Sequence, residues 1–324
     1  MRCRTSNAPS DSRKLPALLS SALVALAAFT SPLRAQQPAV KPVSLAAIID
    51  AMQAREKLAA SVNLRWTRTD HYRAGALLAK SSTWTFSCEL LLKGNSTRYS
   101  GKIINHARGN ISLIDYTTSF DGKESRRVLG LKPPYGSIHR VKETPSYHFE
   151  SPQHLAPLLL FLRPLVEPYS GTFKRRTWNL LEERRSIDGH ECVTVDDGHT
   201  RAYLDCDRDF VPVAFERYME NRAVWYSGSL EYYRKQGALR WVPRTFLLKL
   251  HSSAPSTADE TRGDGVQTEI GVLLKDSDFR LDFGPGTVVW DAGTEEQYRV
   301  RDDGSKESTD RPHRPKPVRK EQAR

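Results

Sequence analysis

The chain has 324 residues, of which 39% are hydrophobic and 27% are charged, and its net charge is +11. The first 35 residues carry +4 of this charge and residues 311–324 carry +5, which leaves +2 for everything between them. We therefore do not expect residues 36–310 to form a nucleic-acid-binding surface, because such surfaces need clustered Lys and Arg.

The N-terminal residues are typical of an export signal. A basic stretch that includes Arg2 and Arg13 precedes an apolar segment at residues 15–29, and residues 33–35 resemble a cleavage site. The apolar segment is short for a membrane span, so an uncleaved anchor is the less favoured alternative. We expect a signal peptide over residues 1–35 and a processed, periplasmic or otherwise exported, soluble monomer of 289 residues.

Residues 44–60 predict an amphipathic helix. Ser44 suits the N-cap, and apolar residues recur at helical spacing at Leu45, Ile48, Ile49 and Met52. The polar face, which includes Arg55, is expected to lie in solvent.

Most of residues 62–298 alternate apolar and polar side chains, as strands with one buried face do. Asp121-Gly122 is a tight hairpin signal. Residues 130–150 and 253–265 are expected to be loops. The predicted strands are 62–66, 82–92, 96–100, 117–120, 125–129, 178–182, 191–195, 201–204, 213–218, 224–233, 239–250 and 267–274, followed by an extended edge over 279–291.

One apolar segment, residues 151–166, interrupts this pattern. Ser151 and Pro152 suit the start of a helix, but Pro157 and Pro164 predict two short helical turns instead of one rod. The segment is either a core helix packed on the sheet or a movable lid over an apolar cavity. Both interpretations place it on the concave face of the sheet.

Three cysteines follow the leader. Cys192 and Cys206 lie on the two arms of a predicted hairpin, so we expect a disulfide between them rather than a metal site, because zinc sites prefer closely spaced pairs. The remaining Cys88 is then either a free thiol or the site of an intermolecular bond. Asp205, Asp207 and Asp209 favour an Asx-type turn over a calcium loop, which would need a glycine and a final glutamate.

No nucleophile elbow, zinc-protease motif or phosphate loop occurs, so we expect a non-enzymatic protein without catalytic residues, metal or cofactor. The C-terminal residues 301–324 are predicted to be a basic disordered tail. An envelope partner or an anionic surface is a candidate for what this tail contacts.

The order of these elements resembles the LolA/LolB-like superfamily of periplasmic lipoprotein carriers and receptors. The resemblance rests on the leader, the helix leading into residues 62–66, and several short motifs. These motifs are Ser96-Thr97-Arg98-Tyr99-Ser100, Phe120-Asp121-Gly122-Lys123, Tyr203-Leu204-Asp205 with Val211-Pro212-Val213, Tyr232 to Gly237, and Trp241-Val242-Pro243. It implies a mainly β fold with helices (α+β), in which helices cover the concave face of a strongly curved antiparallel half-barrel over residues 36–300.

The resulting hypothesis is a binding protein that shelters a lipid or lipoprotein acyl chain in this concavity. The alternative is an envelope interaction module whose sheet is filled by its own side chains. The predicted cavity residues are Trp66, Trp84, Phe86, Leu90, Leu113, Phe120, Trp178, Phe215 and Trp225, with Leu158, Phe161 and Leu162 above them.

Overall fold

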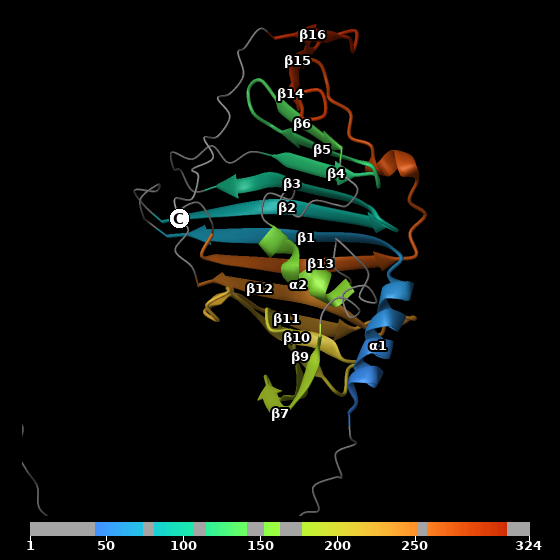
Figure 1. Ribbon diagram of the computed structural model, residues 1–324, viewed down its shortest axis with the longest axis vertical. Helices are drawn as coiled ribbons and strands as arrows, with labels where there is room; N and C mark the ends of the chain where they lie inside the picture. The colour runs from blue at the N-terminus through green and yellow to red at the C-terminus, as the bar shows by residue number, and fades with distance from the viewer. Residues whose placement is uncertain are drawn as a thin grey trace, which may run out of the picture. The chain divides into compact units, whose positions relative to one another are not determined.

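The computed structural model describes residues 43–73, 81–106, 115–140, 152–162, 177–251 and 258–309. The predicted leader, Leu113 and residues 310–324 lie outside this part. The described chain is mainly β with two α-helices and one 3-10 helix: α1 (Leu45–Leu58), α2 (Pro152–Leu162) and η2 (Asp276–Phe279) (Figure 1). The strands are β1 (Ser61–Tyr72), β2 (Ser82–Lys93), β3 (Ser96–His106), β4 (Tyr116–Phe120), β5 (Glu124–Leu129), β6 (Tyr135–Arg140), β7 (Asn179–Ile187), β8 (His190–Asp196), β9 (Thr200–Asp205), β10 (Val211–Tyr218), β11 (Val224–Arg234), β12 (Trp241–Leu250), β13 (Glu260–Ile270), β14 (Val288–Asp291), β15 (Glu296–Val300) and β16 (Lys306–Ser308).

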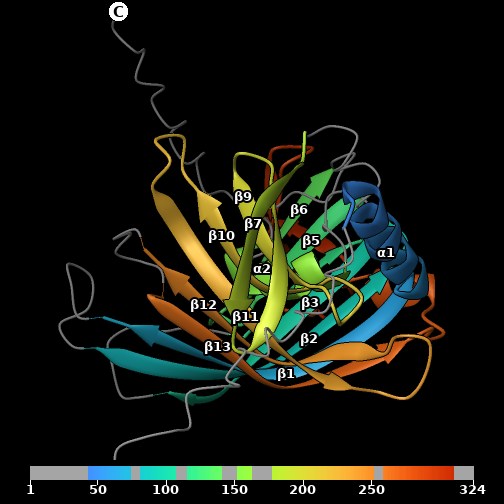
Figure 2. The same cartoon turned by 90° about the horizontal axis from the view of Figure 1, so that it is seen from below.

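All sixteen strands belong to one sheet, in the order β16-β15-β14-β6-β5-β4-β3-β2-β1-β13-β12-β11-β10-β9-β8-β7. The sheet is open and curved, as Figure 2 shows. Except for β6–β7 and β13–β14, neighbours in sequence pair as antiparallel hairpins, and β1 joins β13 in the middle. The prediction of a purely antiparallel sheet is wrong at one place, since β14 pairs with β6 in parallel. That pairing is possible because a long connection separates the two strands in sequence.

One face of the sheet carries the main core, and we call it the inner face. Period-2 alternation in β1 turns Val62, Leu64 and Trp66 to this face, and the register with β2 places Phe86, Cys88 and Leu90 beside them. The buried cluster continues through β8–β13. Helix α2 contacts β10, β11 and β12, and its side chains Leu155, Leu158, Phe161 and Leu162 are fully buried in that cluster.

Several local predictions are confirmed. The N-cap of α1 is Ser44, whose Oγ accepts a hydrogen bond from the Ala47 amide at 3.2 Å. In the β4–β5 hairpin, Asp121 Oδ1 accepts from the Lys123 amide at 2.9 Å and from the Glu124 amide at 2.8 Å. Asp205 closes the predicted Asx-type turn, since its Oδ1 accepts from the Asp207 amide at 2.9 Å.

Other predictions are corrected by the structure. The two expected loops contain strand β6 and the first half of β13, whose Gly263 and Gly265 weakened the strand signal. Helix α2 is one helix with Pro157 inside it, although an internal proline costs a helix about 3 kcal/mol. The burial of four large side chains offsets that cost. The prediction of a disordered tail is wrong for residues 306–308, because they form β16, which pairs with β15.

Candidate functional site

The predicted cavity residues gather on the inner face. Eight of them belong to one buried cluster, with exposures of 4% or less: Trp66, Trp84, Phe86, Leu90, Leu158, Phe161, Leu162 and Phe215. Trp178 and Trp225 pack against its margin, and Phe120 is buried on β4 outside it. Leu113 lies outside the described residues. The sequence therefore located most of an apolar face, but burial alone does not distinguish a ligand wall from a packed core.

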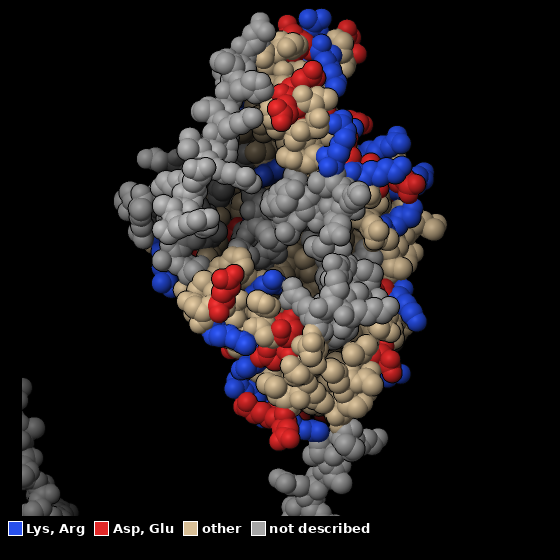
Figure 3. All heavy atoms as spheres, in the orientation of Figure 1, with Lys and Arg blue, Asp and Glu red and all other residues tan. Residues whose placement is uncertain are grey.

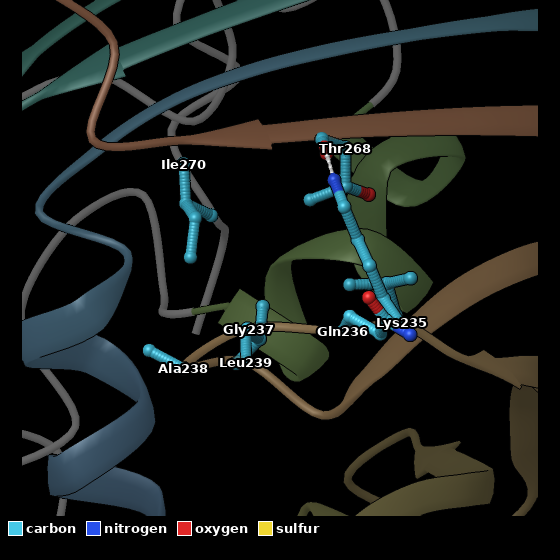
Figure 4. Close-up of a pocket in the computed structure, with 8 residues that line it drawn as sticks. Lys235, Gln236, Gly237, Ala238, Leu239, Thr268 and Ile270 are labelled. Carbon is cyan, nitrogen blue, oxygen red and sulfur yellow. Dashed lines mark hydrogen bonds between the residues drawn. The ribbon is translucent and has the colours of Figure 1, made fainter.

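A pocket of about 230 Å³ opens beside this face (Figure 4). The turn between β11 and β12 forms one side of it, from Lys235 to Leu239, and Val242, Thr268 and Ile270 form the rest. The Lys235 Nζ donates to the Thr268 carbonyl at 2.7 Å across the pocket. A second, more open pocket of about 470 Å³ lies between the turns at residues 197–199 and 219–222. None of the predicted cavity residues lines either one.

A buried polar cluster lies in the middle of the apolar inner face. The alternation that turns Trp66 inward also turns Arg68 and Asp70 inward, and they are 3% and 0% exposed. Arg68 Nη2 lies 2.9 Å from Asp70 Oδ2, while Arg68 Nη1 donates to the hydroxyls of Tyr99 and Tyr116 at 2.8 and 2.7 Å. On the far side, Thr261 Oγ1 donates to Asp70 Oδ1 at 2.9 Å.

Arg68 keeps its charge in this setting. Burial lowers the pKa of Arg68, whereas Tyr99 and Asp70 raise it, and the net direction is upward. The guanidinium also lies over the Phe86 ring, 4.2 Å from its centroid, in a cation–π contact. Tyr99 stays neutral because its burial raises the pKa of the hydroxyl well above the ordinary value. Asp70 is therefore the counter-charge of Arg68.

A second buried arginine links the two helices. Arg55 of α1 is 4% exposed, and its Nη2 donates to the Asp209 carbonyl at 2.6 Å. Its Nη1 donates to the Phe161 carbonyl of α2 at 3.5 Å, and the guanidinium lies 5.4 Å from the Phe161 ring centroid. The expectation that Arg55 lies in solvent is wrong. The helical pattern correctly placed it among polar residues, but the partners that bury it are remote in sequence.

The expected disulfide is not formed, and Cys88, Cys192 and Cys206 are all free. The register explains this difference. Cys192 pairs with Asp205 across β8 and β9, and the Cys206 amide donates to the Glu191 carbonyl at 3.1 Å. The hairpin is therefore shifted by one residue from the predicted pairing, and successive residues of a strand point to opposite faces.

The thiols provide a pH prediction. Burial raises the pKa of Cys88 from 9.0 to about 11, so its thiol stays neutral at pH 8 and should be alkylated by iodoacetamide only slowly. Between these two values the folded state holds a proton that the unfolded state has lost, so this contribution to stability falls as pH rises from about 9. Alkylation of the protein without residues 1–35, followed by mass spectrometry, should show three modified thiols in urea. A mass that is two hydrogens and two labels short would indicate a disulfide and would contradict the assignment of three free thiols.

Charged side chains on the surface are mixed in sign. On the face seen in Figure 3, Lys and Arg alternate with Asp and Glu, and neither sign forms a continuous field over the described part. Several are paired, for example Arg65 Nε with Glu89 Oε1 at 2.8 Å and Lys93 Nζ with Asp276 Oδ1 at 2.9 Å. Among the described residues, no helix has the length and apolar character needed to cross a membrane.

Comparison with known proteins gives similarity at the level of structure. Neither the family models nor the curated proteins match the sequence. The structure is similar to an outer membrane lipoprotein-sorting protein domain from Vibrio parahaemolyticus, at 14% identity and a TM-score of 0.44, covering 72% of this chain and 94% of that one. It is similar to a DUF1329 family protein from Desulfovibrio piger at 11% identity and a TM-score of 0.45, covering 72% and 96% of the two chains. A LolA superfamily protein from Nitrosomonas europaea is similar at 13% identity and a TM-score of 0.43, covering 74% and 99%.

The polar cluster is the feature that sequence reasoning missed. Its signal was present, because Arg68 and Asp70 continue the apolar phase of Val62, Leu64 and Trp66. Charged residues in the inward phase of a strand need partners. The partners on β3, β4 and β13 could not be assigned without the register.

Proposed function

We propose that this protein is an exported binding protein that holds a hydrophobic ligand, a lipid or a lipoprotein acyl chain, between the inner face and α2. The observation that carries the proposal is the extent of the apolar inner face. It spans β1–β4 and β8–β13, whereas α2 is an 11-residue helix whose main contacts are with β10–β12. A strongly curved half-barrel with a helical cover is the arrangement that this function requires.

The chemistry of the α2 contact also supports the proposal. Leucine and phenylalanine side chains join α2 to the sheet, and such contacts are non-directional. An acyl chain offers the same chemistry, and each buried methylene contributes about 0.8 kcal/mol to binding. In this proposal α2 is a movable cover, and an acyl chain takes the place of part of its contact with the sheet.

Ligand binding is tested on the purified, exported protein. Lipid extraction followed by mass spectrometry should recover acyl chains, and a fluorescent fatty acid should gain intensity on addition of the protein. A ligand-free native mass spectrum together with no uptake of the fluorescent fatty acid overturns the proposal.

The link between α1 and α2 gives a test of the movable cover. Arg55→Met removes the donors to the Phe161 and Asp209 carbonyls, and should speed release of the fluorescent fatty acid severalfold while lowering the free energy of unfolding by about 1–3 kcal/mol. Stopped-flow displacement measures the release rate. Lys57→Met is the matched control, because Lys57 is an exposed cation on the same helix. Equal release rates in the two variants would indicate that α2 is a fixed part of the core.

A second candidate function is an envelope interaction module with a self-filled core. It is favoured by the tight burial of the predicted cavity residues, none of which lines either pocket. Here the basic C-terminal tail would contact an envelope partner or an anionic surface. Deleting residues 310–324 leaves β16 intact and separates the two functions. If envelope association disappears and no lipid binds to either form, the interaction module is the better description.

A further inference from the structure

Among the buried polar atoms without a partner in the described part of the chain are two N–H donors of β1 on the inner face. They are the Trp66 Nε1–H and the Arg68 Nε–H, on side chains that are 4% and 3% exposed. They belong to alternate residues of β1 and so lie on the same face. Both side chains contact Tyr99: the Trp66 ring stacks on it with centroids 5.9 Å apart, and Arg68 donates to its hydroxyl.

Unpaired donors in such a place need an explanation. A buried donor without an acceptor costs about 1–3 kcal/mol, and the large majority of buried polar atoms are paired. The neighbouring groups follow that rule, since Arg68 Nη1 has two acceptors and Trp84 Nε1 donates to Ser82 Oγ at 3.3 Å. Other buried side-chain atoms are also unpaired, among them the Thr97 and Thr268 hydroxyls, but Trp66 and Arg68 supply two N–H donors from one strand of the inner face, where the proposed ligand would lie.

We propose that Trp66 and Arg68 bind the carbonyl oxygen of an acyl ester or amide, and so fix the polar end of the ligand on the inner face. This inference rests on the proposed function and adds the chemical class of the ligand. Both groups are donors without acceptor capacity, so they select an oxygen with free lone pairs. A saturated hydrocarbon has no such atom and would leave both donors unpaired.

The charge balance favours a neutral carbonyl over a carboxylate. The positive charge of Arg68 is already matched by Asp70 at 2.9 Å, and both residues are buried. A carboxylate would bring a second negative charge into this cluster, and an unmatched buried charge is strongly disfavoured. An ester or amide oxygen accepts the same hydrogen bonds without that charge.

The experiment compares three C12 ligands on the full exported protein: dodecane, methyl dodecanoate and dodecanoate. Each displaces bound diphenylhexatriene, a fluorescent hydrocarbon, and the result is the ratio of ester affinity to alkane affinity. Trp66→Phe keeps the ring shape but lacks the N–H, and should lower this ratio about two- to tenfold, as expected for one hydrogen bond. Using a ratio removes any general loss of folding from the result.

Trp290→Phe is the matched control, because it removes an indole N–H from β14, outside the buried cluster of the inner face. It should leave the ratio unchanged. The infrared band of a ¹³C-labelled ester carbonyl should move to lower frequency on binding to wild type, and less so with Trp66→Phe. An unchanged ratio and an unshifted band in Trp66→Phe overturn the carbonyl site while leaving hydrophobic binding intact. Stronger binding of dodecanoate than of the ester overturns the choice of a neutral group. If diphenylhexatriene does not bind at all, the proposed function itself fails.

Discussion

Asp70→Asn is expected to lower the free energy of unfolding by about 3–5 kcal/mol, because it removes the counter-charge of Arg68 while both side chains stay buried. Asn keeps the shape of the side chain and an oxygen that accepts from Thr261, so the decrease in the free energy of unfolding measures the effect of removing the negative charge. Urea denaturation monitored by tryptophan fluorescence gives the free energy, and the slope of the transition checks that unfolding remains cooperative.

An exposed ion pair that also involves β1 is the control. Arg65 of β1 pairs with Glu89 of β2, and their side chains are 55% and 37% exposed, so Glu89→Gln should cost less than about 1 kcal/mol. The double variant Arg68→Met with Asp70→Leu should recover much of the loss, since a buried pair replaced by apolar groups is often tolerated. A loss in Asp70→Asn no larger than in Glu89→Gln would contradict a charged, dry Arg68–Asp70 pair.

Phe161→Ala is the second large effect, with an expected loss of about 3–5 kcal/mol, as for other fully buried phenylalanines. Its ring lies 5.5 Å from that of Tyr232 on β11 and contacts Arg55 of α1, so it joins α2 both to the sheet and to the first helix. Thermal unfolding in the presence and absence of a fatty acid measures the loss in each state.

The neighbouring Leu160 is only partly buried, so Leu160→Ala should cost clearly less than Phe161→Ala. If α2 is a movable cover, added fatty acid should restore part of the Phe161→Ala loss, because a ligand that binds the folded state stabilises it. Equal losses in the two variants would indicate that α2 packs without a preferred face.

The sequence predicted the strands well because alternation is a local property. It placed Trp66, Phe86 and Leu90 on one face, since their phase needs no knowledge of the partner strand. The register between paired strands could not be predicted from the sequence. One residue of shift in the β8–β9 hairpin separates Cys192 from Cys206, and the parallel pairing of β6 with β14 leaves no local signal.

The polar part of the site was lost for the same reason. Arg68, Tyr99 and Tyr116 come from three different strands, and only the register brings their polar atoms together. Each of them taken alone looks like an ordinary strand residue. Long-range pairing decides whether such a group is solvated or buried.

The pairing of β1 with β13 sets the order in which the chain folds. The middle of the sheet is made from residues 61–72 and 260–270, so it closes only after nearly all of the chain is available. Hairpins such as β2–β3 and β11–β12 need only local contacts, whereas this central seam has one of the largest loop-closure costs in the sheet. Until that seam forms, β1 and β13 each present an open edge, and such edges bind other extended chains. We therefore expect slow folding limited by the central seam, and a partly folded state in which β1 and β13 need protection from aggregation.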